Sequence, residues 1–181
     1  RLSITEICNF RCAYCLPDGW KKTGPLHFLR PEEIGRLASA LTEVGVGKVR
    51  LTGGEPSVRK DLPEILATLA AVPGMAKIAM TTNGWNLERR SASWRESGLT
   101  HLNVSVDALD ADAFHRIHGP TRLTSVLRGI DDALARDYAS VKLNAVLLRE
   151  TAEKGFADWA RFVKERPVAV RFIELMRTAD N

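Results

Sequence analysis

Residues 48–71, KVRLTGGEPSVRKDLPEILATLAA, contain a strand, a turn and a helix in immediate succession. Lys48 to Thr52 alternates polar and apolar side chains, which is the period of a β-strand with one buried face. The turn Gly53-Gly54-Glu55-Pro56 separates this strand from Asp61 to Ala71, where apolar residues recur at helical spacing. The stretch therefore predicts a βα unit of the kind from which parallel sheets are built.

The same alternation continues on both sides of this unit. We expect further strands at Arg1 to Thr5, Lys77 to Thr82, His101 to Asp107, Val141 to Leu147 and Val168 to Glu174. We expect further helices at Pro31 to Val44, Leu87 to Ser97, Ser125 to Arg136 and Glu153 to Arg166. This order predicts an α/β fold, specifically a partial (βα)6-type, TIM-like barrel of parallel strands with the helices outside. Trp94, Trp159 and Phe162 are spaced along the helices as core residues.

One face of the predicted strands is polar from strand to strand, because residues two apart point to the same side. Its members are Arg1, Ser3, Thr5, Lys48, Arg50, Thr52, Thr81, Asn83, Asn103, Ser105, Asp107, Lys142, Asn144 and Arg171. An antiparallel sheet with a solvated face would alternate in the same way, but the intervening helices favour a barrel whose lumen holds a ligand. Cations buried in such a lumen need a counter-charge, so we expect a polyanionic ligand there.

Three cysteines, Cys8, Cys12 and Cys15, follow the first strand with the spacing C-x3-C-x2-C. Three thiols so close together are poorly explained by a disulfide framework, and metal or redox chemistry is the better interpretation. Bound to a four-iron cluster, they would leave one iron open to an outside ligand. A structural zinc, a thioredoxin-like pair of Cys12 and Cys15, and three unrelated cysteines remain as alternatives. We expect His115 and His118 to lie at a solvated helix end.

Composition narrows the class of protein. The 26 basic and 22 acidic residues give a net charge of +4, which slightly favours anionic ligands without indicating a nucleic-acid partner. No apolar run approaches the roughly 18 residues that suggest a membrane span, and the residues from Arg1 to Ile4 have no signal-peptide pattern. We therefore expect a cytoplasmic protein with no membrane partner.

Several motifs together resemble those of radical S-adenosylmethionine (SAM) enzymes, and most closely those of the molybdenum cofactor biosynthesis protein A family, the GTP 3',8-cyclases. These motifs are RLSIT at 1–5, the cysteine loop with CAYCLPDG at 12–19, KVRLTGGEP at 48–56, TTNG at 81–84, NVSVD at 103–107 and RFIELM at 171–176. Glu6 stands where the family usually has Asp, and the stretch from Ile117 to Arg122 is less typical of the family after its first residues.

The resemblance implies a reaction and its cofactors. One 4Fe-4S cluster on Cys8, Cys12 and Cys15 would bind SAM and cleave it reductively to a 5'-deoxyadenosyl radical. That radical would take hydrogen from ribose C3' of GTP, giving the 3',8-cyclised nucleotide. Residues 1–181 would form the radical SAM core barrel, ending before a C-terminal region that carries a second cluster. Another radical SAM enzyme acting on a phosphorylated nucleotide, or a zinc-stabilised nucleotide-binding module, is the alternative function.

The resemblance also assigns site residues and partners. It places Tyr14, Gly54, Glu55, Ser105 and Met176 at SAM. It places Arg1, Arg50, Thr81 and Lys142 at GTP, with Lys48 and Arg171 beside them. The implied partners are an electron donor such as a flavodoxin or ferredoxin, a second copy of the chain, and the downstream cyclic pyranopterin monophosphate synthase.

Overall fold

The structure is a computed structural model that describes residues 1–176, with the side chains of all of these except 150 and 152–154. Its strands are β1 (Leu2–Ser3), β2 (Lys48–Thr52), β3 (Lys77–Thr82), β4 (His101–Ser105), β5 (Ser140–Leu147) and β6 (Ala169–Glu174). Its α-helices are α1 (Pro31–Glu43), α2 (Leu62–Ala70), α3 (Leu87–Glu96), α4 (Ala111–His118), α5 (Leu123–Leu134) and α6 (Arg149–Glu165), and a short 3-10 helix, η1, spans Pro56–Val58.

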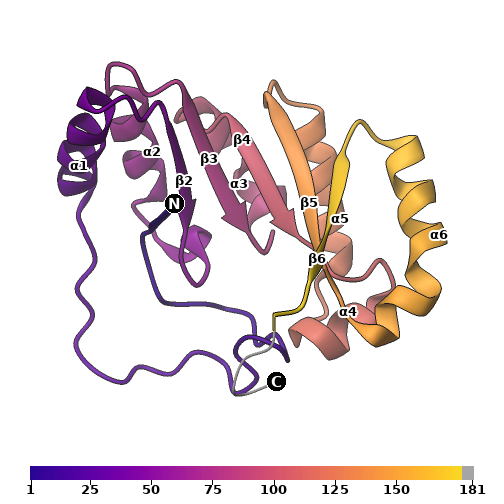
Figure 1. Cartoon of the computed structure of the whole chain (residues 1–181). Coiled ribbons are helices and arrows are strands. Elements are labelled where there is room, and N and C mark those ends of the chain that lie inside the picture. Colours follow the sequence, from indigo (N-terminus) through magenta and orange to yellow (C-terminus); the bar gives the residue numbers. More distant parts are fainter. Residues whose placement is uncertain (177–181) are drawn as a thin grey trace.

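All six strands are parallel and lie in one sheet in the order β1-β2-β3-β4-β5-β6. A doubly wound sheet reverses its strand order at a switch point, and this sheet does not. The predicted partial barrel is therefore confirmed. Within the described residues β1 and β6 do not pair, so the sheet stays open at both edges. Figure 1 shows the strands as a curved wall with helices along one side.

The core lies between the sheet and the helices on its convex side. The apolar face of four strands points toward the helices. Its residues include Leu51, Met80, Val104 and Leu143, and each of them is completely buried. The helices supply the opposite wall, mainly through Ile34, Ile65, Leu66, Leu69, Trp94, Val126 and Ile130. The predicted packing residues Trp94, Trp159 and Phe162 are buried as expected.

The predicted helix ranges did not include α4, although a helix end was expected at His115 and His118. Its first turn is capped by Asp110, whose side chain accepts a hydrogen bond from the Ala113 amide at 2.8 Å. Its C-terminus is followed by Gly119 at φ +92°, a conformation that glycine adopts without a Cβ penalty. Ala113, Phe114, Ile117 and His118 form its buried face. These cap and spacing signals are present in the sequence, but eight residues give a weak helical period.

Strand boundaries also differ slightly from prediction. β1 has two residues rather than five, although the Ile4 amide still donates to the Thr52 carbonyl at 3.0 Å. β4 ends at Ser105, and the Val106 amide continues the pairing by donating to the Asn144 carbonyl at 2.9 Å. Among the described residues, no helix is both long and apolar enough to cross a membrane.

Candidate functional site

The cysteine loop lies at the carboxyl ends of the strands, where barrel enzymes place their chemistry (Figure 1). It is seated on the C-terminus of α4. The Arg11 amide donates to the His118 carbonyl at 3.1 Å, and the Ala13 amide donates to the Ile117 carbonyl at 2.9 Å. The last carbonyls of a helix have no hydrogen-bond partner within the helix. These two bonds therefore give partners both to the loop amides and to the carbonyls at the end of α4. The backbone is therefore held on both sides of Cys12.

The Gly53-Gly54 turn holds the start of the same loop. The Gly54 amide donates to the Thr5 carbonyl at 2.9 Å, and the Glu55 amide donates to the Ile7 carbonyl at 2.8 Å. A Cβ on Gly53 would lie 2.3 Å from the Thr5 carbonyl oxygen, and one on Gly54 would lie 2.4 Å from that of Ile7. The family resemblance places Gly54 at SAM. The structure shows that both glycines let residues 5–7 approach the end of β2.

Glu55 is 1 % exposed, and its carboxylate binds neighbouring protein groups. It accepts hydrogen bonds from the Ser57 amide at 2.9 Å, the Thr82 hydroxyl at 2.7 Å and the Asn83 amide at 2.6 Å. Burial raises the pKa of Glu55, and these hydrogen bonds oppose the increase. Glu55 thus ties the end of β2 to the end of β3. A carboxylate has about four acceptor positions, so it retains little capacity for a ligand amine.

The Asn83 side chain links this network to the cysteine loop. Its Nδ2 donates to Asn9 Oδ1 at 2.8 Å, and its Oδ1 accepts from the Trp85 amide at 3.0 Å. The loop is therefore fixed from three directions, by the β2 turn, by the end of β3 and by α4.

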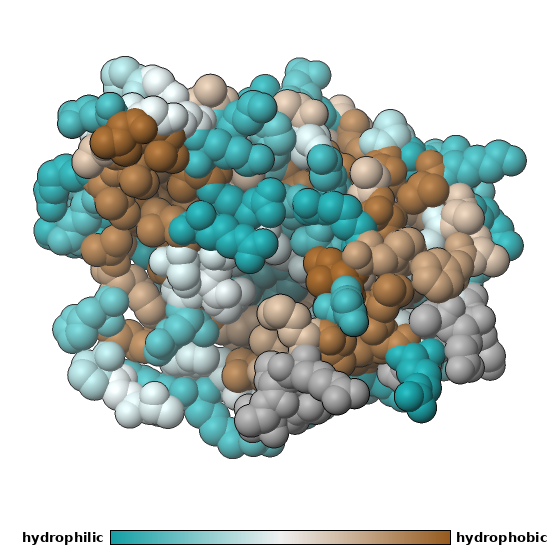
Figure 2. Space-filling model, viewed as in Figure 1, coloured by the Kyte–Doolittle hydropathy of each residue, from teal (hydrophilic) through white to brown (hydrophobic). Residues whose placement is uncertain are grey.

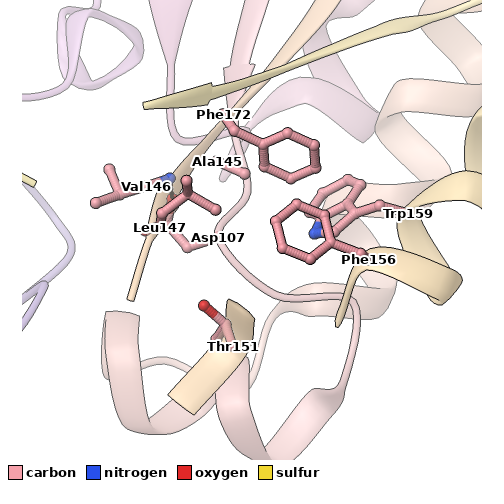
Figure 3. A pocket seen from close by; sticks show the side chains of 8 residues that line it. All are labelled: Asp107, Ala145, Val146, Leu147, Thr151, Phe156, Trp159 and Phe172. Atoms are coloured by element: carbon pink, nitrogen blue, oxygen red, sulfur yellow. Dashed lines mark hydrogen bonds between the residues drawn. The ribbon is translucent and has the colours of Figure 1, made fainter. Parts of the chain in front are cut away.

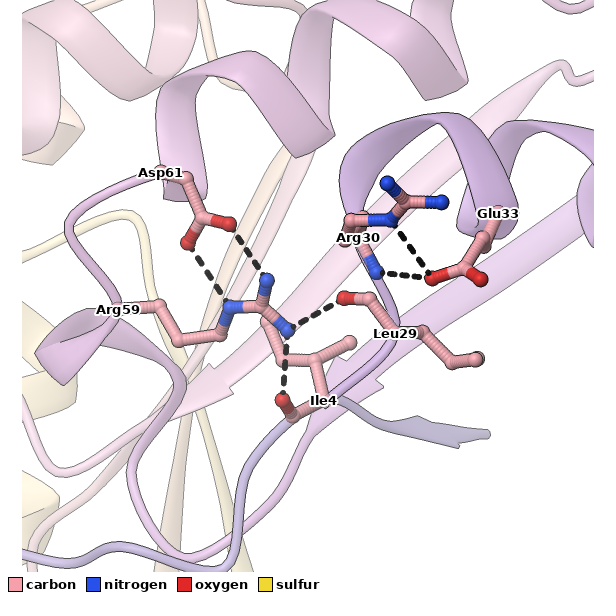
Figure 4. Close-up of polar contacts among 6 residues, drawn as sticks. All are labelled: Ile4, Leu29, Arg30, Glu33, Arg59 and Asp61. Carbon is pink, nitrogen blue, oxygen red and sulfur yellow. Dashed lines mark hydrogen bonds and ion pairs between the residues drawn. The ribbon is translucent and has the colours of Figure 1, made fainter. Parts of the chain in front are cut away.

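Arg59 holds together the two ends of the segment that carries the cysteines (Figure 4). Its guanidinium donates to the Ile4 carbonyl at 2.9 Å and to the Leu29 carbonyl at 3.0 Å. On its other side it pairs with both carboxylate oxygens of Asp61, at 2.9 and 2.5 Å. The Arg59 side chain is only 9 % exposed. It therefore closes the long connection between β1 and α1 at its base.

Replacing Arg59 with methionine is expected to lower the free energy of unfolding by about 2–3 kcal/mol, because a partly buried Asp61 and two carbonyls lose a charged donor. The Arg59 hydrogen bonds lower the pKa of Asp61. The contribution of the pair is thus fully present above the unfolded carboxyl pKa of about 4 and is lost as the pH falls through the lower folded value. Urea unfolding of the wild type and of Arg59→Met should therefore show a smaller difference in the free energy of unfolding at about pH 3 than at neutral pH. Arg161→Met, which breaks an exposed pair with Asp158, is the control with no measurable loss.

All three cysteines are free, with Cys8 and Cys12 half-buried and Cys15 exposed. Burial, then the charge of Asp107, raise the pKa of Cys12 to about 12, and the other two cysteines add to the increase. Burial also raises the pKa of Cys8, with Glu55 and Cys15 contributing. The three thiols are thus close enough to repel one another as thiolates, which suits a donor set for a cation or an iron–sulfur cluster.

Cys8, Cys12 and Cys15 fit a three-cysteine iron–sulfur cluster in residue type and spacing. In the structure, however, their sulfur atoms do not point toward one common centre. Among the residues that the structure describes, no three His, Cys, Asp or Glu side chains converge as a finished metal site. Cys12 Sγ instead lies 3.1 Å from His118 Nδ1. The thiols would therefore have to turn toward one another to hold iron.

His118 was wrongly predicted to lie in solvent, whereas His115, one turn earlier on α4, is exposed as expected. His118 is 1 % exposed and packs against Phe10 and Phe114. Burial lowers the pKa of His118, and Asp107 opposes the decrease. The error came from reading the end of a short helix as solvated before the docked cysteine loop was known to cover it.

Of the residues predicted to contact SAM, Tyr14 lies within the cysteine loop and contacts Asp107. Its hydroxyl donates to Asp107 Oδ2 at 2.6 Å. Ser105 is half-buried at the end of β4, and Gly54 is exposed beside the cysteine loop. Met176 follows β6 and is 80 % exposed.

Asp107 also borders the hollow between the ends of the strands and α6. Figure 3 shows its small inner pocket, where Phe156, Trp159 and Phe172 face Ala145 and Leu147. A larger cavity of about 510 Å³ adjoins it and is lined in part by Asp107, Asp110, Arg116 and Asp158. The described part of the chain thus combines a largely apolar pocket with a more polar cavity, and Asp107 lines both.

The cations predicted from strand alternation do gather on the polar face of the sheet. Burial, then the charges of Arg171 and Arg1, lower the pKa of Arg50. Burial, then the charges of Lys48, Lys77, Lys142 and Arg50, lower the pKa of His101. Arg171 also donates to the side chains of Asn103 and Asn144, with the Asn144 bond at 2.8 Å. Thr81 is half-buried on the same face, in register with Asn103.

The predicted burial of these cations is wrong. Arg1, Lys48 and Arg171 are exposed, and Arg50 and Lys142 are half-buried. The physical reason is that six strands leave the sheet open, so the polar face is not enclosed as a lumen by the described residues. Figure 2 shows hydrophilic side chains across the middle of this face, with apolar regions on either side.

Comparison with known proteins places this site in a family. A sequence profile of the Radical SAM superfamily matches residues 2–163. Two relatives are the GTP 3',8-cyclases of Vibrio atlanticus, 47 % identical over 99 % of this chain, and Stenotrophomonas maltophilia strain K279a, 53 % identical over 100 % of it. The chain spans about half the length of these relatives, 54 % and 56 % respectively.

Solved structures support the fold alone. The structure of Streptococcus suis SuiB bound to the precursor peptide SuiA has a TM-score of 0.80 at 16 % identity, covering 96 % of this chain and 38 % of that one. The structure of anSMEcpe with bound AdoMet has a TM-score of 0.74 at 16 % identity, covering 97 % of this chain and 51 % of that one. The three-cysteine loop, the open parallel barrel and the profile match agree, and the chain belongs to the radical SAM superfamily, whose enzymes combine an iron–sulfur cluster with SAM.

Proposed function

We propose that this chain is the SAM-cleaving barrel of a GTP 3',8-cyclase, a lyase of molybdenum cofactor biosynthesis. Its substrate would be GTP and its product 3',8-cyclo-7,8-dihydroguanosine 5'-triphosphate. Relatives that carry this name align with the chain along its whole length. We further propose that residues 1–181 form one core barrel, and that completing the reaction also requires a second cluster outside these residues.

The observation that carries the substrate class is the gathering of like charges on the polar face. Arg1, Arg50 and Arg171 lie close enough for their repulsion to lower the pKa of Arg50, after the effect of burial. Positive charges brought together in a fold are stabilised by an anion that neutralises several of them at once. A triphosphate has the charge for this. These charges support the assignment of Arg1, Lys48, Arg50, Lys142 and Arg171 to GTP, and the family resemblance adds Thr81.

At the opposite end of the site, we propose that Cys8, Cys12 and Cys15 hold one 4Fe-4S cluster, with Tyr14, Gly54, Ser105 and Met176 around SAM. When bound, the reduced cluster supplies the electron that cleaves SAM to the radical that takes hydrogen from ribose C3'. The protein residues orient the two ligands and compensate charge. Glu55 would act mainly by holding β2 and β3 in place, since three donors already occupy its carboxylate.

The reaction also implies partners. An electron donor such as a flavodoxin or ferredoxin would reduce the cluster, and the cyclic pyranopterin monophosphate synthase would consume the product. We include a second copy of the chain as a homodimer partner. Each is part of the proposal for the full-length protein.

The test of the substrate is anaerobic turnover by the full-length protein with SAM and GTP deuterated at ribose C3'. The proposal predicts a cyclised nucleotide and transfer of deuterium into 5'-deoxyadenosine. SAM cleavage without deuterium transfer, and with GTP recovered unchanged, would indicate a different radical SAM activity.

Lys142 provides a quantitative test of the phosphate assignment. Lys142→Gln is expected to raise the KM for GTP about tenfold or more, because one charged hydrogen bond to phosphate contributes roughly 1.5–3 kcal/mol. The value of kcat should change little if the contact is equal in ground and transition states. Lys164→Gln is the matched control, since Lys164 is exposed on α6. An unchanged KM in Lys142→Gln would remove Lys142 from the GTP site.

A further inference from the structure

His118 is a buried side chain that neither the family resemblance nor the proposed chemistry uses. It is the last residue of α4 and is 1 % exposed. Its ring lies between Phe10 and Phe114, with centroid distances of 5.7 and 4.3 Å. These contacts explain why the ring is fixed in place, but they do not explain why the residue is a histidine.

The two ring nitrogens have different neighbours. Nδ1 lies 3.1 Å from Cys12 Sγ. Nε2 lies 3.5 Å from Asp107 Oδ2 and makes no hydrogen bond within the part of the chain that the structure describes. Asp107 is itself held by the Tyr14 hydroxyl at 2.6 Å and by the Val146 amide at 2.8 Å. The ring is therefore presented to the cysteine sulfur by a fixed set of groups.

The backbone on both sides of Cys12 is anchored to the end of the helix that carries His118. The residues on both sides of Cys12 donate backbone hydrogen bonds to carbonyls at the end of α4, and one of these carbonyls belongs to His118 itself. The Cys12 backbone is therefore held beside the residue that carries the imidazole.

We propose that His118 is a positioning residue for Cys12 and a donor to its sulfur, an inference that rests on the proposed cluster site. Cys12 has no hydrogen when it binds iron as a thiolate, so the contact can persist only if Nδ1–H of the ring donates. A hydrogen bond to a ligating sulfur stabilises the added negative charge of the reduced cluster and raises its reduction potential. His118 would thus make the cluster easier to reduce.

The test is a redox titration followed by electron paramagnetic resonance, on the anaerobically reconstituted full-length protein. His118→Leu removes the donor, and His118→Asn keeps an amide N–H near the position of Nδ1. His115→Leu is the matched control, because His115 is exposed on the same helix. Any cluster outside residues 1–181 is common to all four proteins, so differences report on the site of Cys12.

We expect the midpoint potential of His118→Leu to shift to a more negative value, with His118→Asn closer to wild type and His115→Leu unchanged. Should His118→Leu take up no iron, retention of iron by His118→Asn would still support the donor role. A fully loaded His118→Leu with the wild-type midpoint overturns the inference and leaves the cluster site standing, and loss of iron from both variants also contradicts it. Absence of iron in the wild type would instead overturn the proposed cluster site itself, and the role of His118 with it.

Discussion

Replacing Cys12 with serine is expected to remove the iron bound at this loop and to reduce SAM cleavage to background. Three thiolates leave one iron of a four-iron cluster open, and a hydroxyl does not replace a soft thiolate ligand at neutral pH. The fold should survive, because the exchange of sulfur for oxygen is small and Cys12 is only half-buried. Iron and sulfide analysis beside far-ultraviolet circular dichroism would measure both effects.

The matched control for Cys12→Ser is Ala13→Ser. Ala13 is the next residue of the loop and is exposed, so this change adds a hydroxyl without removing a ligand. We expect it to bind a full complement of iron. A Cys12→Ser protein with the wild-type iron content would mean that Cys12 is not a ligand.

Gly54→Ala is expected to have the second largest effect, on both stability and iron content. The new Cβ would lie 2.4 Å from the Ile7 carbonyl oxygen and 2.6 Å from that of Glu6. Because these are backbone atoms, residues 6 and 7 would have to move away from β2, and Cys8 would move with them. Overpacking of this kind costs roughly 1–3 kcal/mol.

Urea unfolding and iron analysis of the same Gly54→Ala preparation would test this steric account. The midpoint should fall without a change in the slope, and the bound iron should fall with it. Gly24→Ala serves as the control, since a Cβ there meets no atom within 4 Å. Wild-type stability and iron content in Gly54→Ala would show that the close approach of residues 5–7 to the turn is not needed.

The parallel barrel was predictable because it depends on local patterns. Strand alternation at Lys48 to Thr52 and the helical period after Asp61 are properties of a few neighbouring residues, and the same pattern recurred along the chain. The polar face was predictable for the same reason, since alternation alone places Arg50, Lys142 and Arg171 on one side.

The details that were missed depend on contacts between distant parts of the chain. Whether His118 is buried depends on the cysteine loop, which lies more than a hundred residues earlier. The network around Glu55 depends on groups of β3 that its own motif does not contain. Likewise, the exposure of Arg171 depends on whether the sheet closes. The periodicity of the sequence carries no information about the burial of His118, the network around Glu55 or the exposure of Arg171.

The most direct test of the central claim is the electron paramagnetic resonance spectrum of the anaerobically reconstituted full-length protein, reduced, with and without SAM. The claim predicts a 4Fe-4S signal that depends on Cys8, Cys12 and Cys15 and that changes when SAM is added, because SAM binds the iron that the three cysteines leave open. Zinc in place of iron, or a cluster signal that SAM leaves unchanged, would contradict it.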